Sequence, residues 1–258
     1  MRIRWNTTNA EIERGTVLEP ALTRWNAELA RGLTGKKKAA AARKAAQLHL
    51  MPGDFENLRR IVNVMSILQE ATLDLSKKGV PTICKVLPLY KIVQQHLEDS
   101  LANISLAEDT CNLRAAIQAG LDKLNKHTEK ALVSDFPLIG AVLHPAIRLA
   151  YFKDPLRGND EDLASRAETL LEHLYDVYKE ELTDSTPATP STKPMASTMS
   201  PSKGIFRRAV AGTGLGKLLP AKTQTELQVY FSGIFPMAEG DDDILAWWKV
   251  IFRYCAVY

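Results

Sequence analysis

Two stretches between residues 54 and 101 carry apolar residues at the three- and four-residue spacing of amphipathic helices. In the first stretch the apolar positions are Phe55, Leu58, Ile61, Val62, Met65 and Leu68. In the second they are Ile83, Val86, Leu87, Tyr90, Val93 and Leu97. Gly79 and Pro81 lie between the two, and these residue types are typical of a turn that leads into a helix. We therefore predict two long helices that pack against each other as a hairpin.

The segment before this hairpin is also predicted to be helical. Helices are expected over residues 10–15 and 19–33, with Thr8 or Asn9 as the N-cap of the first. Either side chain can accept a hydrogen bond from an unpaired backbone N–H of the first turn. A break is expected between Gly15 and Pro20.

Three further stretches follow the hairpin. A capping box at Ser105–Glu108 is expected to begin a helix that runs to about Val133. Residues 138–152 are almost wholly apolar, so we expect them to be buried, with a break at Pro145. A last long helix is predicted after Asn159–Asp162. No strand-like alternation competes with these patterns, and the predicted fold class is all-α, a bundle of long amphipathic helices.

Residues 183–223 differ in composition from everything before them, because Ser, Thr and Pro dominate. Such a segment has too little apolar surface to offset the entropy lost on ordering, so we predict a disordered linker. After Ser185 its charged residues are all Lys or Arg, which makes it basic. Within it, Gly212–Lys217 resembles a phosphate-binding loop, but no strand precedes it and neither Ser nor Thr follows the Lys, so we reject that interpretation. The expected domains are a helical domain (1–182), the linker (183–223) and a C-terminal segment (224–258).

The C-terminal segment is predicted to contain two short helices. Glu226–Phe231 forms the first, and Asp241–Asp243 precedes the second. Consecutive carboxylates at a helix start point in different directions, so we interpret them as a cap and not as a metal site. Leu245, Trp248 and Phe252 share one face of the second helix, an apolar surface too large to be left in water. This helix is therefore expected to dock on another surface.

Composition excludes several classes of protein. The chain has 258 residues, of which 45% are hydrophobic, enough for a sizeable core. No apolar run approaches the roughly 20 residues that span a bilayer, so no membrane partner is expected. Cys84, Cys111 and Cys255 lack the spacing of a zinc site and are expected to be free thiols. No histidine lies in a nucleophile motif, and no catalytic residue is predicted. These features fit a protein of the cytosol or nucleus.

The net charge of +3 is small, so the position of the positive charge matters more than its sum. Lys36, Lys37, Lys38, Arg43 and Lys44 lie in an Ala-rich, strongly helix-forming stretch. Such a helix can contact phosphates. The alternative interpretation is a solvated helix that serves solubility alone.

Several blocks of the chain resemble, in the same order, sequence blocks of the hAT superfamily of DNA transposases. Residues Asp243–Lys249, preceded by Glu226-Leu227-x-x-Tyr230, look like the C-terminal dimerisation region of that family. Arg4–Thr8 is similar to its T-R-W-N-S run. Residues 81–90 are similar to its P-T-I…V-L-P-x-Y block, and residues 143–152 to its L-D/H-P…Y-F block. The resemblance extends over nearly the whole chain apart from the linker.

The resemblance implies an architecture and a chemistry. Such transposases have an RNase H-like catalytic domain interrupted by a large all-helical insertion, and this chain resembles the insertion and the start of the region after it. The family cuts and rejoins DNA with three carboxylates that hold Mg²⁺ or Mn²⁺, two before the R-W-N run and one after the W-W-K helix. Neither region is present in the chain, so no catalytic residue, metal ligand or cofactor is expected. The chain also departs from the family at Cys255, where Pro is usual.

The resulting prediction is a truncated, catalytically inert hAT-type transposase fragment in the nucleus that associates with DNA and with itself. The residues expected to contact DNA are Arg4, Trp5, Asn6, Lys36, Lys37, Lys38, Arg43 and Lys44. The residues expected to mediate dimerisation are Leu245, Trp247, Trp248 and Phe252. For Trp5, packing against the first helices is an equally open role.

The predicted linker also bears on self-association. With the helical body on the far side of a linker, a Trp248→Glu change is expected to make the chain more monomeric with little loss of helix. The alternative function is a helical protein-interaction scaffold with no nucleic-acid role. The two functions differ in whether the basic residues at 36–44 and in the linker face the same side as Arg4 and Trp5.

Overall fold

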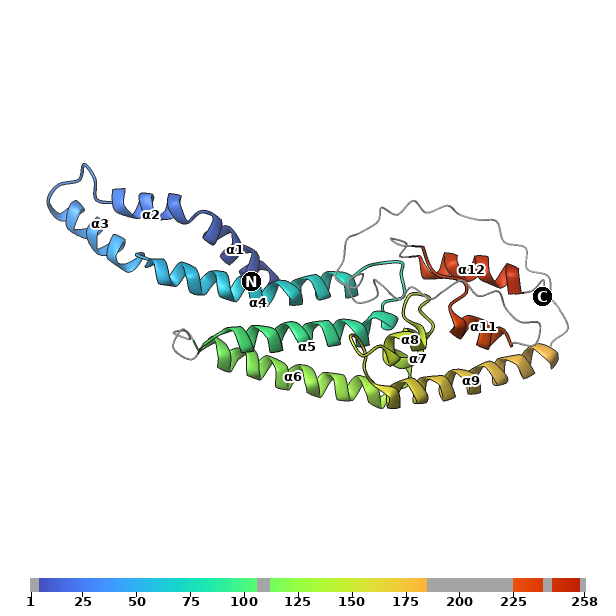
Figure 1. Cartoon of the computed structure of the whole chain (residues 1–258). Coiled ribbons are helices and arrows are strands. Elements are labelled where there is room, and N and C mark those ends of the chain that lie inside the picture. Colours follow the sequence, from blue (N-terminus) through green and yellow to red (C-terminus); the bar gives the residue numbers. More distant parts are fainter. Residues whose placement is uncertain (1–4, 106–111, 185–224, 239–242, 256–258) are drawn as a thin grey trace. The chain divides into compact units, whose positions relative to one another are not determined.

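The computed structural model confirms the all-α class. It describes residues 5–105, 112–184, 225–238 and 243–255 (Figure 1). These ranges contain eleven α-helices, one 3-10 helix and no strand. None of the helices in them is both long enough and apolar enough to cross a membrane. The chain divides into two compact units, Met1–Gln69 with His96–Leu121, and Glu70–Gln95 with Asp122–Tyr258.

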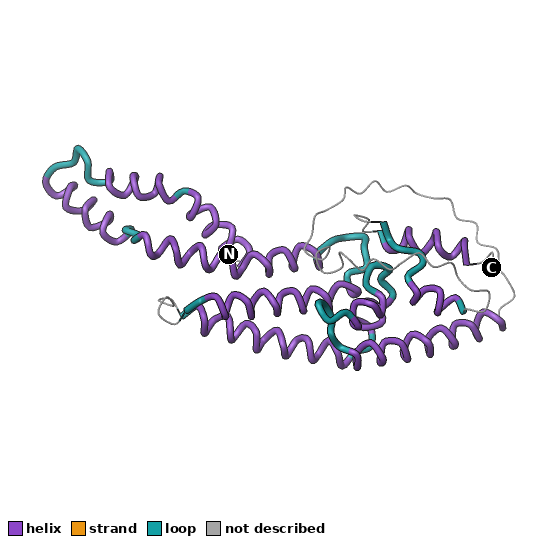
Figure 2. The backbone as a smooth tube through the Cα atoms, in the orientation of Figure 1, coloured by secondary structure: helices purple, strands orange, loops and turns teal. Residues whose placement is uncertain are grey.

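The first unit is formed by helices that the hydrophobic pattern predicted in outline. It contains α1 (Trp5–Val17), α2 (Glu19–Glu28) and α3 (Gly35–Gln47), together with parts of α4 (Pro52–Leu75), α5 (Val86–Asn103) and α6 (Leu113–Val133). Figure 2 shows α2 and α3 joined by a short loop and running back along each other. The predicted end of α6 at Val133 is confirmed. The helix expected over residues 19–33 instead ends at Glu28 and is followed by a turn.

The predicted hairpin of α4 and α5 is confirmed within this unit. Nε2 of His96 on α5 lies 3.0 Å from the backbone carbonyl oxygen of Asn63 on α4. Helix α6 contacts the C-terminal end of α5 through Arg114. Its Nη1 donates to the carbonyl of Leu101 at 2.6 Å and to that of Ile104. The last carbonyls of a helix have no partner within it, so Arg114 satisfies groups that would otherwise be unpaired.

The expected N-cap at Thr8 or Asn9 is wrong. Helix α1 begins at Trp5, so both residues lie inside it. Asn9 is only 3% exposed, and its Nδ2 donates to Oε1 of Gln69 on α4 at 2.8 Å. A tertiary contact therefore uses the side chain that the local pattern assigned to capping.

Some predictions concern residues outside the described ranges. The Ser105–Glu108 capping box and the linker (183–223) fall there almost entirely, as do Asp241 and Asp242. For Asp243 the prediction of a cap is confirmed, because its Oδ1 accepts a hydrogen bond from the backbone N–H of Ala246 at 2.9 Å. Cys84 is a buried free thiol, as expected, and burial raises its pKa to about 11.

The second unit holds the most deeply buried core. Besides the remaining parts of α4, α5 and α6, it contains η1 (Ile83–Lys85), α7 (Phe136–Val142), α8 (Arg148–Lys153), α9 (Glu161–Asp184), α11 (Glu226–Ser232) and α12 (Ile244–Cys255). The apolar stretch 138–152 is buried as predicted, and Pro145 separates α7 from α8. Helix α7 approaches η1 closely at Gly140, where a Cβ atom would lie 3.0 Å from Cγ2 of Ile83.

Candidate functional site

Helix α3 carries five cationic residues and no acidic one. All five, Lys36, Lys37, Lys38, Arg43 and Lys44, are exposed. At 3.6 residues per turn, four of them fall in a sector of about 120° around the helix, and Lys38 lies on the opposite side. Ala40 lies at the centre of that sector and is exposed. A large anion can therefore approach the helix between the four cations, which we call the α3 basic face (Lys36, Lys37, Arg43, Lys44).

The N-terminal end of α3 strengthens this positive field. Its first turn contains three lysines and no acid, and the side chain of the N-cap residue, Thr34, makes no capping hydrogen bond. The N-terminus of a helix carries partial positive charge, so helix stability alone would favour acidic residues there. The observed arrangement instead adds positive charge to an end that already favours anions.

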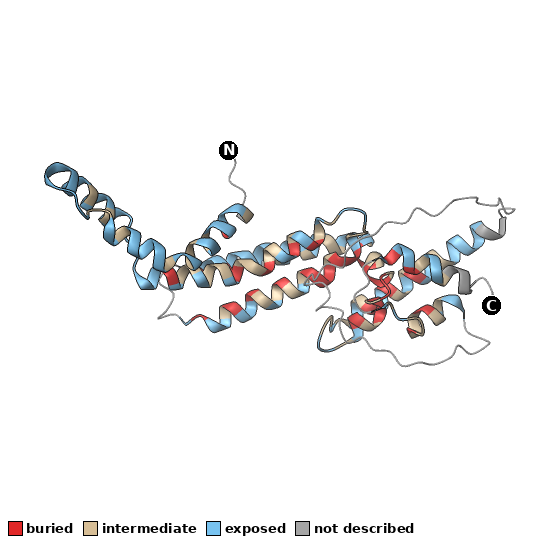
Figure 3. Ribbon diagram, turned by 90° about the horizontal axis from the view of Figure 1, so that it is seen from above, coloured by how far each residue is buried: buried red, intermediate tan, exposed pale blue. Residues whose placement is uncertain are grey.

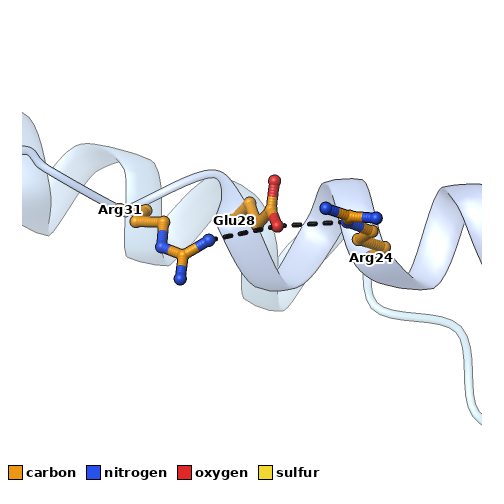
Figure 4. A network of polar contacts seen from close by, with 3 residues as sticks. All are labelled: Arg24, Glu28 and Arg31. Carbon is orange, nitrogen blue, oxygen red and sulfur yellow. Dashed lines mark hydrogen bonds and ion pairs between the residues drawn. The ribbon is translucent and has the colours of Figure 1, made fainter.

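The arginines in and just after the neighbouring helix α2 form ion pairs with a glutamate, unlike the cations of α3. Glu28 accepts from both Arg24 and Arg31, each at 3.2 Å (Figure 4). Arg59 of α4 pairs with Glu19 of α2. In the part of the chain that the structure describes, no ion pair involves a cation of α3. The charges on α3 therefore remain available to an external anion.

Both helices of the α2–α3 lobe (residues 19–47) are unusually exposed. Neither helix contains a buried residue. Figure 3 shows the lobe almost entirely in the colour of exposed residues. Its exposed side chains include Leu22 and Trp25, the latter 49% exposed. Such a lobe contributes little to a core, so its sequence is free to serve an external contact.

The other residues predicted to contact DNA are only partly described. Arg4 and the side chain of Trp5 lie outside the described part of the chain. Asn6 lies in the first turn of α1 and is half-buried. Its Oδ1 has no hydrogen-bond partner among the described residues. The α3 cations are thus the members of the predicted set that the structure shows as exposed.

The C-terminal helices pack on the second unit through two side-chain hydrogen bonds. The hydroxyl of Tyr230 donates to the carbonyl of Val142 at 2.7 Å, and Nε1 of Trp248 donates to the carbonyl of Leu143 at 3.1 Å. Val142 and Leu143 lie at the C-terminal end of α7. Burial raises the pKa of Tyr230, so its hydroxyl stays protonated and keeps donating.

Arg148 lies beneath these aromatic residues and is 3% exposed. Its guanidinium carbon is 5.1 Å from the ring centre of Tyr230 and 5.7 Å from that of Trp247, which are cation–π distances. Its Nη2 donates to the carbonyl of Phe235. Burial lowers the pKa of Arg148 from its very high ordinary value. The backbone of Arg148 has a φ of 53°, in the left-handed region that few side chains adopt.

These contacts correct the expectation that α12 is separate from the helical body. Trp247 is 9% exposed and Trp248 is half-buried, both against the second unit. Leu245 is 52% exposed. The side chain of Phe252 lies outside the described part. Trp248→Glu is therefore expected to disturb packing within the chain as well as self-association.

Sequence reasoning missed Arg148 and Tyr230 as partners. A single cation inside an apolar stretch is a signal that could have identified Arg148, because a buried charge needs compensating contacts. It also missed a capping box at the start of α11, in which Gln228 N–H donates to Thr225 Oγ1 at 3.2 Å and Thr225 N–H donates to Gln228 Oε1 at 3.1 Å. The spacing Thr-x-x-Gln is the corresponding sequence signal.

Within the described residues, no group of three or more His, Cys, Asp or Glu side chains is arranged to hold a metal ion. Comparisons of the chain with protein-family models, with curated proteins and with solved structures found no match.

Proposed function

We propose that this chain binds DNA through the phosphate backbone, with the α3 basic face as the contact. The observation that carries the proposal is a helix face with four exposed cations and no compensating acid. From Lys36 to Lys44 the face extends about 12 Å along the helix, which corresponds to roughly three to four phosphates of one strand. The sequence resemblance to hAT transposases supports a DNA partner, and such a partner would place the protein in the nucleus.

Binding of this kind is sequence-independent and depends steeply on salt. Cations that contact phosphates release counterions and carry no base information. With about four contacts, the slope of log K against log salt is expected near −3.6, so raising the salt from 50 to 200 mM weakens binding by roughly 100-fold. Fluorescence anisotropy with two unrelated 20-base-pair duplexes measures both properties.

The role of the α3 basic face is tested by replacing its cations, with a lysine on the opposite side of the same helix as the control. Replacing Lys36, Arg43 and Lys44 by Gln is expected to make the slope shallower by about 2.7. Lys38→Gln removes an exposed lysine from the opposite side and is expected to change the slope by less than about 0.3. If Lys38→Gln weakens binding as much as Lys36→Gln does, net charge and not the face controls affinity. A salt-insensitive or sequence-selective affinity would refute backbone binding.

The second candidate function is a helical protein-interaction scaffold. The exposed apolar side chains of the α2–α3 lobe, Leu22 and Trp25 among them, favour it. If the lobe binds a protein through these side chains and no nucleic acid, neither duplex will bind at 50 mM salt. Replacing Leu22 and Trp25 by Ser separates the two functions, because it leaves the α3 cations in place and is expected to leave DNA affinity unchanged.

A further inference from the structure

The second unit contains a cavity of about 300 Å³ between α9, α11 and α12. Its walls are almost entirely apolar. They include Leu171 and Leu174 from α9, Leu227 and Tyr230 from α11, and Trp247 and Ile251 from α12. Pockets of this size and character accept small apolar molecules when a few polar groups fix their orientation.

Arg148 supplies such a polar group in the cavity wall. It is 3% exposed, and its Nε–H has no hydrogen-bond acceptor in the described part of the chain. Its described contacts are the rings of Tyr230 and Trp247, the hydroxyl of Tyr230 and one backbone carbonyl, and none of these carries a negative charge. The only carboxylate among the described lining residues belongs to Glu226, which is exposed and makes no described ion pair. A buried guanidinium that borders a cavity and has no counter-ion favours an external anionic oxygen.

We propose that this cavity binds an amphipathic monocarboxylate, with its carboxylate on Arg148 and its apolar body among the side chains of α9 and α12. The cavity volume corresponds to roughly ten groups of water or methylene size. A straight-chain acid of about ten carbons therefore fits the space. The proposal is independent of the α3 basic face, which lies in the first unit.

The probe is sodium decanoate labelled with ¹³C at the carboxyl carbon, added to the full chain and followed by NMR and calorimetry. We expect saturable 1:1 binding, a rise in the melting temperature, and a carboxyl pKa in the complex below that of the free acid. Decanol, which has the same apolar body and no charge, is expected to bind at least tenfold more weakly. Equal affinities for decanoate and decanol would overturn the role of Arg148.

Two variants complete the test. Leu174→Trp fills the cavity without changing Arg148 and is expected to abolish binding while circular dichroism shows the helix content unchanged. Arg148→Gln is expected to remove the preference for decanoate over decanol. If Arg148→Gln fails to fold, the decanol comparison and Leu174→Trp still decide the matter. Unsaturable uptake of several decanoate molecules, or binding unaffected by Leu174→Trp, would refute the site.

Discussion

Two residues of the C-terminal helices donate hydrogen bonds to backbone carbonyls at the C-terminal end of helix α7. This helix has seven residues and ends at Val142, in the buried core. The carbonyls of its last turn have no partners within the helix, and water does not reach a buried helix end. Tyr230 and Trp248 donate to two carbonyls at that end. Two aromatic side chains thus contribute both apolar burial and hydrogen bonding at one place.

Removing one of these donors is expected to destabilise the second unit. Trp248→Phe keeps an aromatic ring but leaves the carbonyl of Leu143 without its donor, so the free energy of unfolding should fall by about 1–3 kcal/mol. Guanidinium denaturation followed by circular dichroism measures the change. The same substitution at Trp25, which is exposed on α2, should change stability by less than about 0.5 kcal/mol. Equal effects at the two positions would contradict the role assigned to Trp248.

At the scale of elements, the loop between α8 and α9 lies close against α8. The backbone N–H of Gly158 donates to the carbonyl of Tyr151 at 3.1 Å, and that of Asp160 donates to the carbonyl of Phe152 at 2.9 Å. Asp160 then begins α9, because its Oδ1 accepts from the backbone N–H of Leu163 at 2.9 Å. These bonds fold the loop back on α8 and set the start of the longest helix in the second unit.

This close approach predicts a requirement for glycine. A Cβ atom at Gly158 would lie 2.6 Å from the Cα of Phe152 and 2.6 Å from the carbonyl oxygen of Tyr151, both backbone atoms that cannot rotate away. Gly158→Ala is therefore expected to lower the free energy of unfolding by about 1–3 kcal/mol. Gly15→Ala is the control, because nothing lies within 4 Å of its Cβ position on α1. It should raise stability by about 0.5–1 kcal/mol in the same denaturation experiment. If Gly158→Ala leaves the free energy of unfolding unchanged, the requirement for glycine is contradicted, because the loop has then moved to accommodate the Cβ atom.

At the scale of the whole chain, the second unit is assembled from segments far apart in sequence. The hydrogen bonds from Tyr230 and Trp248 connect residues separated by 88 and 105 positions. The hydrogen bond from Arg148 to Phe235 spans 87 positions. The C-terminal helices therefore belong to the same compact unit as α7, α8 and α9.

Cutting the chain between α9 and α11 tests this assembly directly. A site-specific protease sequence inserted after Ser197 allows a single cut between the two segments. Because the contacts at Val142, Leu143 and Arg148 do not depend on covalent connection, the two fragments should elute together in size-exclusion chromatography. The double variant Tyr230→Ala with Trp248→Ala should release the C-terminal fragment after the same cut. Separation of the fragments without these substitutions would refute the assembly.

The sequence by itself determined the helical class, the long helices in outline, the end of α6 at Val133, the break at Pro145 and the basic character of α3. Each of these depends on residues within a few turns of one another. Apolar residues at helical spacing define α4, α5, α6 and α9 whatever they pack against, because backbone hydrogen bonds in a helix are local. The exposure of the α3 cations follows from the same local pattern, since charged side chains without partners stay in water.

Only the tertiary structure decided which surfaces meet. The pattern gave α12 an apolar face, but it did not identify the end of α7 as its partner or Trp248 as a donor to Leu143. The pattern assigned Asn9 a local capping role, but in the structure its side chain donates to Gln69, 60 positions away. It placed Arg148 in an apolar stretch without indicating the rings that surround it. The physical reason is that periodicity defines which face of a helix avoids water, whereas the partner of that face depends on the packing of segments 60 to 105 residues apart.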